Sequence, residues 1–310
     1  MTPGGYPNPT SMAIFVGLDC GGSSSRVLAI DEQDMPIFRG QSGPANLLST
    51  PESVLLQNLT AATSGCPEAD SVCGCFAGLV GQDVTVRAIE HLRTLFPAAK
   101  TIRVEPDYAA ALAACGNDAD ACVIAGTGSV ICSRSAEGLV KSGGRGPILG
   151  DPGSAAEIGR ETLSAYLDDP HAFSPAFREK LIEVFGSEVQ GDIVSRIYSA
   201  PSPAASLAKL ESAASCEALA GNLKVQDLIQ QEMRALAGLL TNHLQSFRLS
   251  TAIAKVGLAG GLWKSGPHYR EAFEANWIDL NPKMTIELFI LRKAPVEGAA
   301  QLAKEAHIGH

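Results

Sequence analysis

The hydrophobic positions of the chain alternate between short apolar runs and longer stretches with helical spacing. Residues 13–18 and 121–125 are unbroken apolar runs next to glycine-rich turns, a pattern typical of buried strands. Residues 225–247 instead place apolar side chains along one broad face, which predicts an amphipathic helix. Predicted strands cover 13–18, 27–30, 36–39, 71–76, 101–104, 121–125, 130–133, 252–257 and 285–290. Predicted helices cover 51–63, 84–95, 108–115, 225–247, 268–276 and 296–306, with further helices between 154 and 225.

Strands and helices therefore alternate along the chain, which predicts the α/β class. Capping residues set some of the expected ends. Thr50 is the expected N-cap of the first helix, with Pro51 at its first position, and Gly116 is expected to end the helix 108–115. Between residues 143 and 153 the sequence is dense in glycine, which predicts a loop.

One hydrophobic pattern occurs twice. FVGLDCGGSSSRVLAI and CVIAGTGSVICSR both read as an apolar strand, a turn of small residues and a returning strand. Repetition of such a hairpin about 105 residues later suggests a duplicated unit, one copy per domain. Two such turns facing each other across a cleft would form a clamp. Neither turn matches the Walker or the Rossmann glycine pattern, so those two nucleotide-binding folds are excluded.

Charge and length narrow the class of protein further. The 310 residues carry 24 Lys and Arg against 33 Asp and Glu, a net charge of −9. This acidic balance argues against nucleic acid or an anionic membrane as a partner. With no run of 18 apolar residues the chain has no expected membrane span. Residues 1–11, rich in proline and glycine, are expected to form a disordered leader rather than a signal peptide, and the protein is expected to be cytoplasmic.

The eight cysteines contain no C-x-x-C pair, and most lie in apolar runs. Buried free thiols of a reducing compartment have this distribution, and a zinc site is not expected.

The two glycine turns are the candidate chemical sites. In DCGGSSS, residues 19–25, consecutive backbone N–H groups can surround a phosphate, and Asp19 can hold Mg²⁺ through water. The same residues also fit an ordinary hairpin turn with a solvated aspartate. GTGS, residues 126–129, is equally ambiguous, since Thr127 and Ser129 can simply satisfy local backbone groups.

Seven motifs in one order are more specific than either turn. They are VGLDCGGSSSRVLAI, GPANLL, FAGLVGQD, EPDYAAALAA, VIAGTGSV, GGRGPILGDPGSAAEIG and GLAGGLWKSG. With them, the chain from about residue 13 to residue 306 resembles the BadF/BadG/BcrA/BcrD-type ATPases, the group that contains N-acetylglucosamine kinase. These belong to the actin-like, sugar-kinase and Hsp70 superfamily. The resemblance implies two actin-like (ribonuclease H-like) ATPase domains around a central cleft, residues 12–117 plus 294–310 and residues 118–293.

The resemblance also implies roles for individual residues, with ATP and Mg²⁺ as cofactors. Asp19 would lie near Mg²⁺. The sets implied to bind ligands are Gly21, Gly22, Ser23, Gly126, Thr127 and Gly128 for phosphate, Gly260 and Gly261 for adenosine, and Asn46, Arg145, Gly150 and Asp151 for the sugar.

Asp107 falls where these kinases keep their catalytic aspartate. A sugar hydroxyl that attacks the γ-phosphorus must lose its proton, and a positioned general base typically contributes about 10²–10⁴-fold. Asp107 also opens an alanine-rich helix after Pro106, so it is a candidate N-cap as well. Both roles are compatible, because N-terminal N–H groups keep a carboxylate ionised.

Two positions depart from the family pattern. Arg145 stands in GGRG where the kinases typically have Trp, and Pro152 stands in GDPGS where they have an acid. The Trp belongs to the sugar pocket. Arg145 therefore either meets an anionic or more polar substrate or points to solvent.

The expected function is ATP-dependent phosphorylation of an amino sugar, N-acetylglucosamine or glucosamine, at the 6-hydroxyl. The expected partner is a small sugar, with no nucleic acid and no membrane, and with a homodimer as a possible assembly. Alternatives are a kinase for another hexose-like substrate, an ATPase activator of the dehydratase and benzoyl-CoA-reductase type with a shared [4Fe–4S] cluster, and a non-catalytic sugar sensor. The activator needs two cluster-ligating cysteines per subunit, and the sensor needs a DNA-binding module that the sequence lacks.

Overall fold

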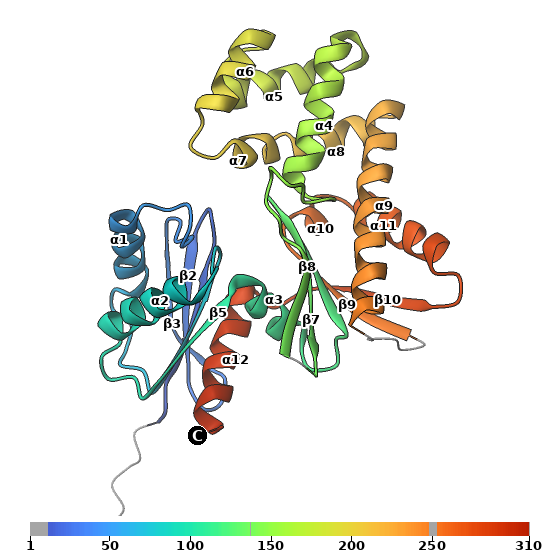
Figure 1. Cartoon of the computed structure of the whole chain (residues 1–310). Coiled ribbons are helices and arrows are strands. Elements are labelled where there is room, and N and C mark those ends of the chain that lie inside the picture. The colour runs from blue at the N-terminus through green and yellow to red at the C-terminus, as the bar shows by residue number, and fades with distance from the viewer. Residues whose placement is uncertain (1–11, 137, 248–252, 310) are drawn as a thin grey trace, which may run out of the picture. The chain divides into compact units, whose positions relative to one another are not determined.

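The computed structural model of the chain describes residues 12–136, 138–247 and 253–309 (Figure 1). The predicted leader, residues 1–11, and residue 252, the predicted start of a strand, lie outside the described residues. The strands are β1 (Phe15–Cys20), β2 (Ser25–Ile30), β3 (Pro36–Ser42), β4 (Ser71–Phe76), β5 (Thr101–Pro106), β6 (Ala121–Ala125), β7 (Ser129–Ser135), β8 (Gly138–Gly143), β9 (Ile253–Ala259) and β10 (Thr285–Ile290). The α-helices are α1 (Glu52–Thr63), α2 (Gln82–Leu95), α3 (Asp107–Cys115), α4 (Ala155–Asp168), α5 (Pro175–Phe185), α6 (Gln190–Ser199), α7 (Pro203–Ala208), α8 (Glu211–Leu219), α9 (Leu223–Ser246), α10 (Leu262–Ser265), α11 (Pro267–Leu280) and α12 (Pro295–Ile308).

These elements form two five-stranded sheets with the same connectivity. The first has the order β3-β2-β1-β4-β5, and the second has the order β10-β9-β6-β7-β8. In each sheet the first three strands along the chain pair antiparallel in sequence order. The fourth strand pairs parallel with the first, and the fifth pairs parallel with the fourth. The α/β class is therefore confirmed, and the duplication predicted from the two hairpins is present in the topology.

Contacts divide the described chain into two compact units. One comprises the residues up to Asn117 together with those from Arg292 onward, and the other is Asp118–Leu291. The C-terminal helix α12 thus belongs to the unit formed by the N-terminal part of the chain.

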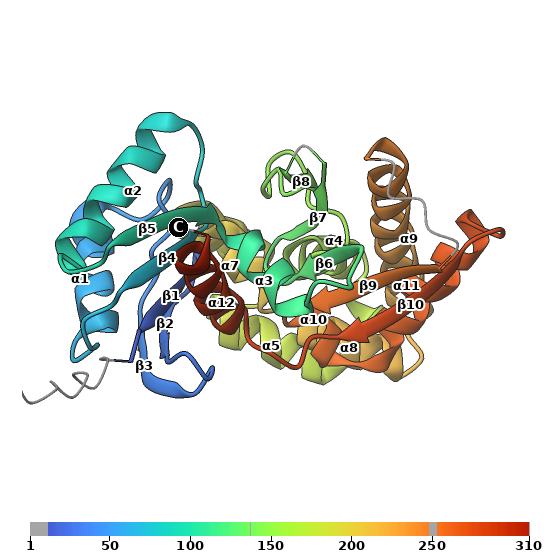
Figure 2. The ribbon, with the colours of Figure 1, turned by 90° about the horizontal axis from the view of Figure 1, so that it is seen from below.

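The first unit has three layers. Val16 and Leu18 of β1 pack with Leu59 and Leu92 of α1 and α2 on one face of the sheet. Gly17 lies on the opposite face against α12, where an added Cβ would come 2.1 Å from the Ala300 nitrogen. Figure 2 shows α12 and α3 on this face. A side chain at position 17 would therefore force α12 away from the sheet.

The second unit places all the helices from α4 to α9 between β8 and β9 in the chain. Figure 1 shows α4 to α8 gathered beyond one end of this sheet. The Trp263 Nε1–H of α10 donates to the Val123 carbonyl at 3.2 Å and fixes that helix to β6. His243 of α9 is fully buried and bridges two strands, with ring nitrogens 2.8 Å from the hydroxyls of Ser133 and Ser142.

Several predicted ends were wrong, each for a local reason. β1 runs on to Cys20, because Asp19 still pairs with Arg26 and does not begin the turn. Pro51 rather than Thr50 holds the N-cap position of α1. The strand β8 was not predicted, since its exposed and half-buried residues lack an apolar signature.

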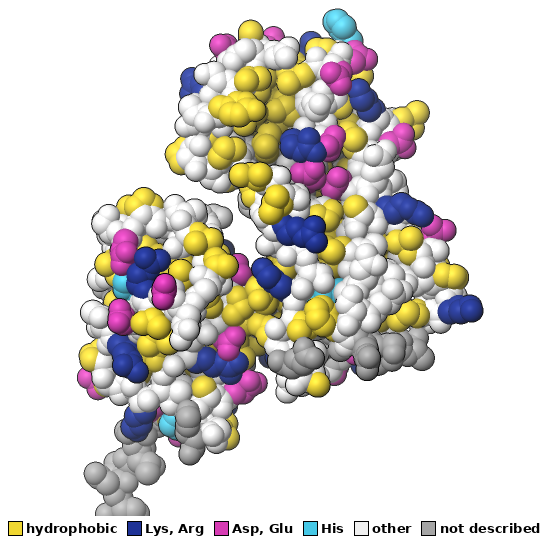
Figure 3. Space-filling model, in the orientation of Figure 1, with side chains coloured by type: hydrophobic (Ala, Val, Ile, Leu, Met, Phe, Trp, Pro, Cys, Tyr) yellow, Lys and Arg dark blue, Asp and Glu magenta, His cyan; other side chains and the backbone are white. Residues whose placement is uncertain are grey.

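The described helices and one face of the molecule were compared with what a membrane span or a basic patch would need. None of the described helices combines the length and apolar character needed to cross a membrane. On the face shown in Figure 3, Lys and Arg side chains lie singly among acidic and apolar ones. That face therefore offers no continuous basic patch.

Candidate functional site

The first half of the candidate site lies at the carboxyl ends of β1, β4 and β5. Cys20, Phe76 and Pro106 are paired in register across these strands. The Ala77 N–H donates to the Cys20 carbonyl at 2.8 Å, and the Ala45 N–H donates to the Gly21 carbonyl at 3.0 Å. The loops that follow β3 and β4 are thereby fixed beside the turn between β1 and β2.

The carboxylates of Asp19 and Asp107 lie at this edge, and the charge of Asp107 acts on Asp19. Asp19 is half-buried two residues beyond Gly17, on the sheet face covered by α3 and α12, and Asp107 is the first residue of α3. Burial, and then the negative charge of Asp107, raise the pKa of Asp19 to about 6, while Arg26 opposes the shift. The same burial and the same two carboxylates raise the pKa of the Cys20 thiol. Two carboxylates so placed favour a bound cation or a shared proton.

Asp107 is not the N-cap of α3, because Pro106 occupies that position and makes no side-chain capping bond. The Asp107 carboxylate instead accepts from the Tyr108 N–H at 2.9 Å. It is therefore still held at the helix N-terminus, where backbone N–H groups favour the ionised form.

The turn after β1 is short and open. The Gly21 N–H donates to the Ser24 carbonyl at 2.9 Å, and Gly22 and Ser23 at the tip are exposed. The N–H groups of Gly22 and Ser23 make no hydrogen bond to any residue that the structure describes. Free N–H groups at a glycine turn suit an anion such as phosphate.

Asn46 lies in the loop that is bonded to this turn, but its side-chain oxygen is already used. Its Oδ1 accepts from the N–H groups of Leu48 and Ser49, at 2.8 and 3.1 Å. Asn46 Oδ1 also lies against Gly78, where an added Cβ would come within 2.4 Å. Among the described contacts the Nδ2 amide has no partner, so Asn46 can offer a ligand donors rather than an acceptor.

The second half of the candidate site is the turn Gly126–Gly128, which lies on the start of α4. The Gly126 N–H donates to the Gly128 carbonyl at 2.9 Å, which makes the turn tight. The N–H groups of Ala155 and Ala156 donate to the carbonyls of Gly126 and Thr127, at 2.8 and 3.3 Å. Thr127 and Gly128 remain exposed. The first turn of α4 thus fixes the carbonyls and leaves the tip accessible.

Asp151 organises the glycine-dense loop. It is buried, with 6% of its surface exposed, and its Oδ1 accepts from the N–H groups of Arg145 and Gly146, at 2.9 and 3.0 Å. Its Oδ2 lies at Gly128, where an added Cβ would come within 2.7 Å. Gly150, at φ +92°, donates to the Gly146 carbonyl at 3.0 Å and closes the loop. Asp151 therefore connects this loop to the turn Gly126–Gly128.

Gly260 and Gly261 follow β9 beside the same turn. At Gly260, with φ +105°, an added Cβ would come 2.0 Å from the Ala125 carbonyl oxygen, so only glycine fits this approach. Gly261 is exposed, with open space around it. Within the second unit, the structure therefore brings together Gly126, Gly128, Asp151 and Gly260.

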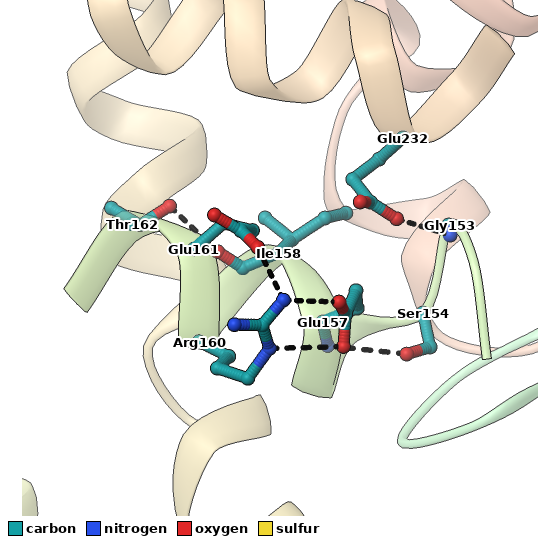
Figure 4. A network of polar contacts seen from close by, with 8 residues as sticks. All are labelled: Gly153, Ser154, Glu157, Ile158, Arg160, Glu161, Thr162 and Glu232. Carbon is teal, nitrogen blue, oxygen red and sulfur yellow. Dashed lines mark hydrogen bonds and ion pairs between the residues drawn. The ribbon is translucent and has the colours of Figure 1, made fainter. Parts of the chain in front are cut away.

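Sequence reasoning missed the charged network at the start of α4 (Figure 4). Ser154 is the N-cap and accepts from the Glu157 N–H at 3.2 Å. Arg160 pairs with Glu157 at 2.5 Å and also with Glu161. Glu232 of α9 accepts from the Gly153 N–H at 2.7 Å, and burial is the main cause of its raised pKa. The spacing S-A-A-E signalled the cap, whereas no sequence pattern pointed to Glu232.

Arg145 and Pro152, the two departures from the family pattern, both flank Asp151 in this loop. Arg145 is exposed, and its guanidinium makes no hydrogen bond or ion pair with any described residue. The Pro152 carbonyl accepts from the Ser129 hydroxyl at 2.7 Å. The guanidinium is free for a ligand or for water.

All eight cysteines lie in the described part of the chain, and each is a thiol rather than half of a disulfide. Cys73 and Cys75 are buried on β4, with their sulfur atoms 3.9 Å apart, and Cys122 and Cys132 are buried on the second sheet. These four thiols are closed inside sheets, so they are not placed to ligate a cluster at a surface.

A sequence model of the BadF/BadG/BcrA/BcrD ATPase family matches residues 16–303. A curated relative, the N-acetylmuramic acid/N-acetylglucosamine kinase of Clostridium acetobutylicum, is 23% identical over 290 residues, which cover 89% of this chain and 94% of that protein. Two solved structures of candidate N-acetylglucosamine kinases are also similar, each at 21% identity and covering 94% of this chain and 99% of theirs. They come from Porphyromonas gingivalis, with a TM-score of 0.76, and from Chromobacterium violaceum, with a TM-score of 0.71.

Proposed function

Because this chain belongs to the BadF/BadG/BcrA/BcrD ATPase family, we propose that it is an ATP-dependent kinase of an amino sugar. We propose N-acetylglucosamine or glucosamine as the acceptor and its 6-hydroxyl as the site of transfer. The observation that carries this proposal is that Asp19 and Asp107 both lie at the carboxyl edge formed by β1, β4 and β5, beside an open glycine turn. The three relatives described above are named as kinases of N-acetylated amino sugars, and these names support the same substrate class.

Asp107 is the proposed general base. Its carboxylate sits at the first position of α3 and is held there by the Tyr108 N–H. In this position it accepts the proton of the sugar hydroxyl as that oxygen attacks the γ-phosphorus. The transition state is loose, so the proton leaves late, and orientation of the hydroxyl matters as much as basicity.

The two glycine turns are the proposed phosphate contacts. Gly22 and Ser23 in the first unit, and Thr127 and Gly128 in the second, present exposed backbone N–H groups or small side chains. Such groups stabilise phosphate oxygens without filling the space that the nucleotide needs. Gly260 and Gly261 are proposed to lie against the adenosine.

Asp19 is the proposed Mg²⁺-binding residue, and its surroundings favour a bound divalent cation. A divalent cation would relieve the repulsion that raises the pKa of Asp19. Among the described residues no group of three or more His, Cys, Asp and Glu side chains could hold a metal alone. This suits Mg²⁺, which keeps several waters and is held by one or two carboxylates together with phosphate oxygens. Bound there, Mg²⁺ would neutralise charge on the transferred phosphate.

The direct test measures ADP release with ATP, Mg²⁺ and a panel of hexoses, hexosamines and acidic sugars. Selective turnover with an amino sugar, and NMR that places the product phosphate on the primary oxygen, are the expected results. ADP release that no sugar stimulates would contradict the proposal. The burial of Cys73, Cys75, Cys122 and Cys132 argues against these four as ligands of the cluster that the activator alternative needs. A purified protein that is brown and loses iron on oxidation would support that alternative.

A further inference from the structure

A cavity of about 300 Å³ lies between the start of α1 and the helix α2, and all of its lining residues belong to the first unit. The two helices cover the same face of the first sheet (Figure 1). The volume is at the lower end of the range found for small-molecule sites. The polar side chains of the lining are those of Thr50, Glu52, Arg87 and His91. None of these four belongs to the proposed kinase machinery.

Arg87 and His91 direct their donors at the same carboxylate. They are four positions apart on α2 and therefore lie on one face of the helix. Arg87 Nη1 is 3.7 Å from Glu52 Oε2, and His91 Nε2 is 3.4 Å from Glu52 Oε1. A charge-assisted N–H···O hydrogen bond normally measures about 2.7–2.9 Å. Glu52 thus lies near both donors without a strong bond to either.

The three side chains differ in exposure. The His91 side chain is 13% exposed, whereas those of Arg87 and Glu52 are 43% and 53% exposed. Glu52 is also the one acid among the described residues that line the cavity. Ion pairs between exposed side chains contribute little to stability, so Glu52 can turn toward water at small cost. The two donors then remain at the cavity wall.

The donors that remain suit a phosphate group. A guanidinium presents parallel N–H groups that match phosphate or carboxylate oxygens. The Thr50 Oγ1 already accepts from the Asn46 N–H at 3.1 Å, and among the described contacts its O–H donates to no acceptor. A phosphate offers at least three terminal oxygens to the donors of Arg87, His91 and Thr50, whereas a carboxylate offers two.

We propose that this cavity, termed the α1–α2 anion site, binds a phosphate group, with Arg87, His91 and Thr50 as donors and Glu52 displaced into solvent. Glu52 is then an internal competitor that occupies the donors when no ligand is bound. The site shares no lining residue with the glycine turns proposed to hold the phosphates of ATP. It is a second phosphate site, and its existence does not depend on the kinase reaction.

Hydrogen bonds connect the α1–α2 anion site to Asn46. The Thr50 N–H donates to the Asn46 carbonyl at 3.0 Å, and the Asn46 N–H donates to Thr50 Oγ1. Asn46 is a proposed sugar contact, so this step rests on the proposed kinase activity. A phosphate bonded to Thr50 acts on the turn that positions Asn46, and its occupancy therefore changes the KM for the sugar.

The test is calorimetric titration with inorganic phosphate and with glycerol 3-phosphate. Mg²⁺ and a saturating non-hydrolysable ATP analogue are present, so that the glycine turns are occupied. Arg87→Gln should weaken phosphate binding at least about 10-fold. Glu52→Gln should strengthen it about 5-fold, because the competing charge is gone. Arg93→Gln removes the same charge from an exposed position on another face of α2 and should leave the affinity within about twofold.

Tighter binding of glycerol 3-phosphate than of inorganic phosphate would assign the site to a phosphorylated metabolite, and the reverse order would assign it to free phosphate. Affinities that Arg87→Gln and Glu52→Gln leave unmoved, or binding that the ATP analogue abolishes, would overturn the site.

The connection to Asn46 is tested with the sugar-kinase assay. Saturating phosphate should change the KM for the sugar at least about fivefold in the unchanged protein and leave it unchanged in Arg87→Gln. A KM that bound phosphate does not move would overturn the coupling. If no sugar is phosphorylated, the kinase proposal fails, and the titrations still decide the α1–α2 anion site.

Discussion

In the first unit β1 carries a carboxylate, Asp19, to its end, whereas β6, the equivalent strand of the second unit, ends in Ala125. In the second unit the corresponding carboxylate is that of Asp151, which lies in a loop and accepts hydrogen bonds from two backbone N–H groups. Burial, and then the negative charge of Asp107, raise the pKa of Asp19. The same strand order thus occurs in both units with different electrostatics. In the first unit Asp19 and Asp107 repel each other, and in the second unit the Asp151 carboxylate accepts two backbone hydrogen bonds. Carboxylates that repel each other and have raised pKa values are typical of functional sites, whereas a carboxylate held by backbone hydrogen bonds is typical of a structural role.

The strongest test of this contrast removes the proposed base. Asp107→Asn keeps the shape of the side chain and should lower kcat about 10²–10⁴-fold while nucleotide affinity stays within about twofold. Steady-state kinetics and calorimetric titration with ATP measure the two effects. Asp83→Asn, at the exposed first turn of α2, is the matched control and should be silent. Equal losses of turnover and of ATP affinity would show that Asp107 only shapes the helix.

Removal of the satisfied acid should mainly cost stability. Asp151→Ala leaves the N–H groups of Arg145 and Gly146 without their acceptor, so the free energy of unfolding should fall by about 2–4 kcal/mol. Urea denaturation checks this value. Asp151→Asn retains an acceptor oxygen and should recover most of the loss. If both variants are as stable as the unchanged protein, the loop does not depend on this carboxylate.

The second unit also contains a buried histidine whose effect on stability has a definite sign. Burial lowers the pKa of His243 from 6.5 to about 4. Between these values the unfolded chain binds more protons, so the stability that neutral His243 provides is lost as pH falls below about 6.5. Between pH 7.5 and pH 5 the free energy of unfolding of the unchanged protein should fall by about 2 kcal/mol more than that of His243→Gln. Urea denaturation of both proteins at the two pH values measures this difference. Parallel losses in the two proteins would remove His243 as the cause.

Asp19 should behave in the opposite way. Its folded pKa, about 6, lies above the ordinary value of 3.8, so the folded protein loses stability as pH rises from about 3.8 to about 6, and the loss is complete above that. Without Mg²⁺ or nucleotide, Asp19→Asn should raise the free energy of unfolding by about 1–2 kcal/mol at pH 7.5, because residual solvent reduces the full shift. At pH 4 the difference should disappear. The same variant should lose magnesium-dependent turnover, and an unchanged Mg²⁺ titration would count against the metal role.

The smallest expected effect concerns Arg145. Its guanidinium has no described partner, so replacement should leave the fold intact and alter only which sugar is accepted. Arg145→Trp should raise kcat/KM for N-acetylglucosamine relative to glucosamine a few-fold, since an aromatic face packs on a sugar ring. Arg145→Gln is the control for loss of charge alone. A ratio that neither variant moves would place Arg145 in solvent.

The sequence predicted the scaffold better than the contacts of the site. Strands 71–76, 121–125 and 285–290 were placed without error, because each is an apolar run with clear ends. The strand β8 was not predicted, because its sequence, GLVKSG, has glycine at both ends and no buried face. In the site, Asp151 was identified, yet its backbone donors depend on how the loop closes, and Glu232 reaches Gly153 from 79 positions away. Such pairs leave no local pattern in a single sequence.

The glycine contact between β1 and α12 has a consequence for synthesis on the ribosome. Gly17 is synthesised long before Ala300, the residue that covers it. The Ser71 hydroxyl donates to the Ala303 carbonyl at 2.7 Å, so this hydrogen bond also forms only after α12 has been synthesised. The second unit, Asp118–Leu291, has all of its residues before α12 emerges. Synthesis of the first unit therefore begins before that of the second unit and ends after it, and until α12 is made one face of the first sheet lacks the helix that covers it.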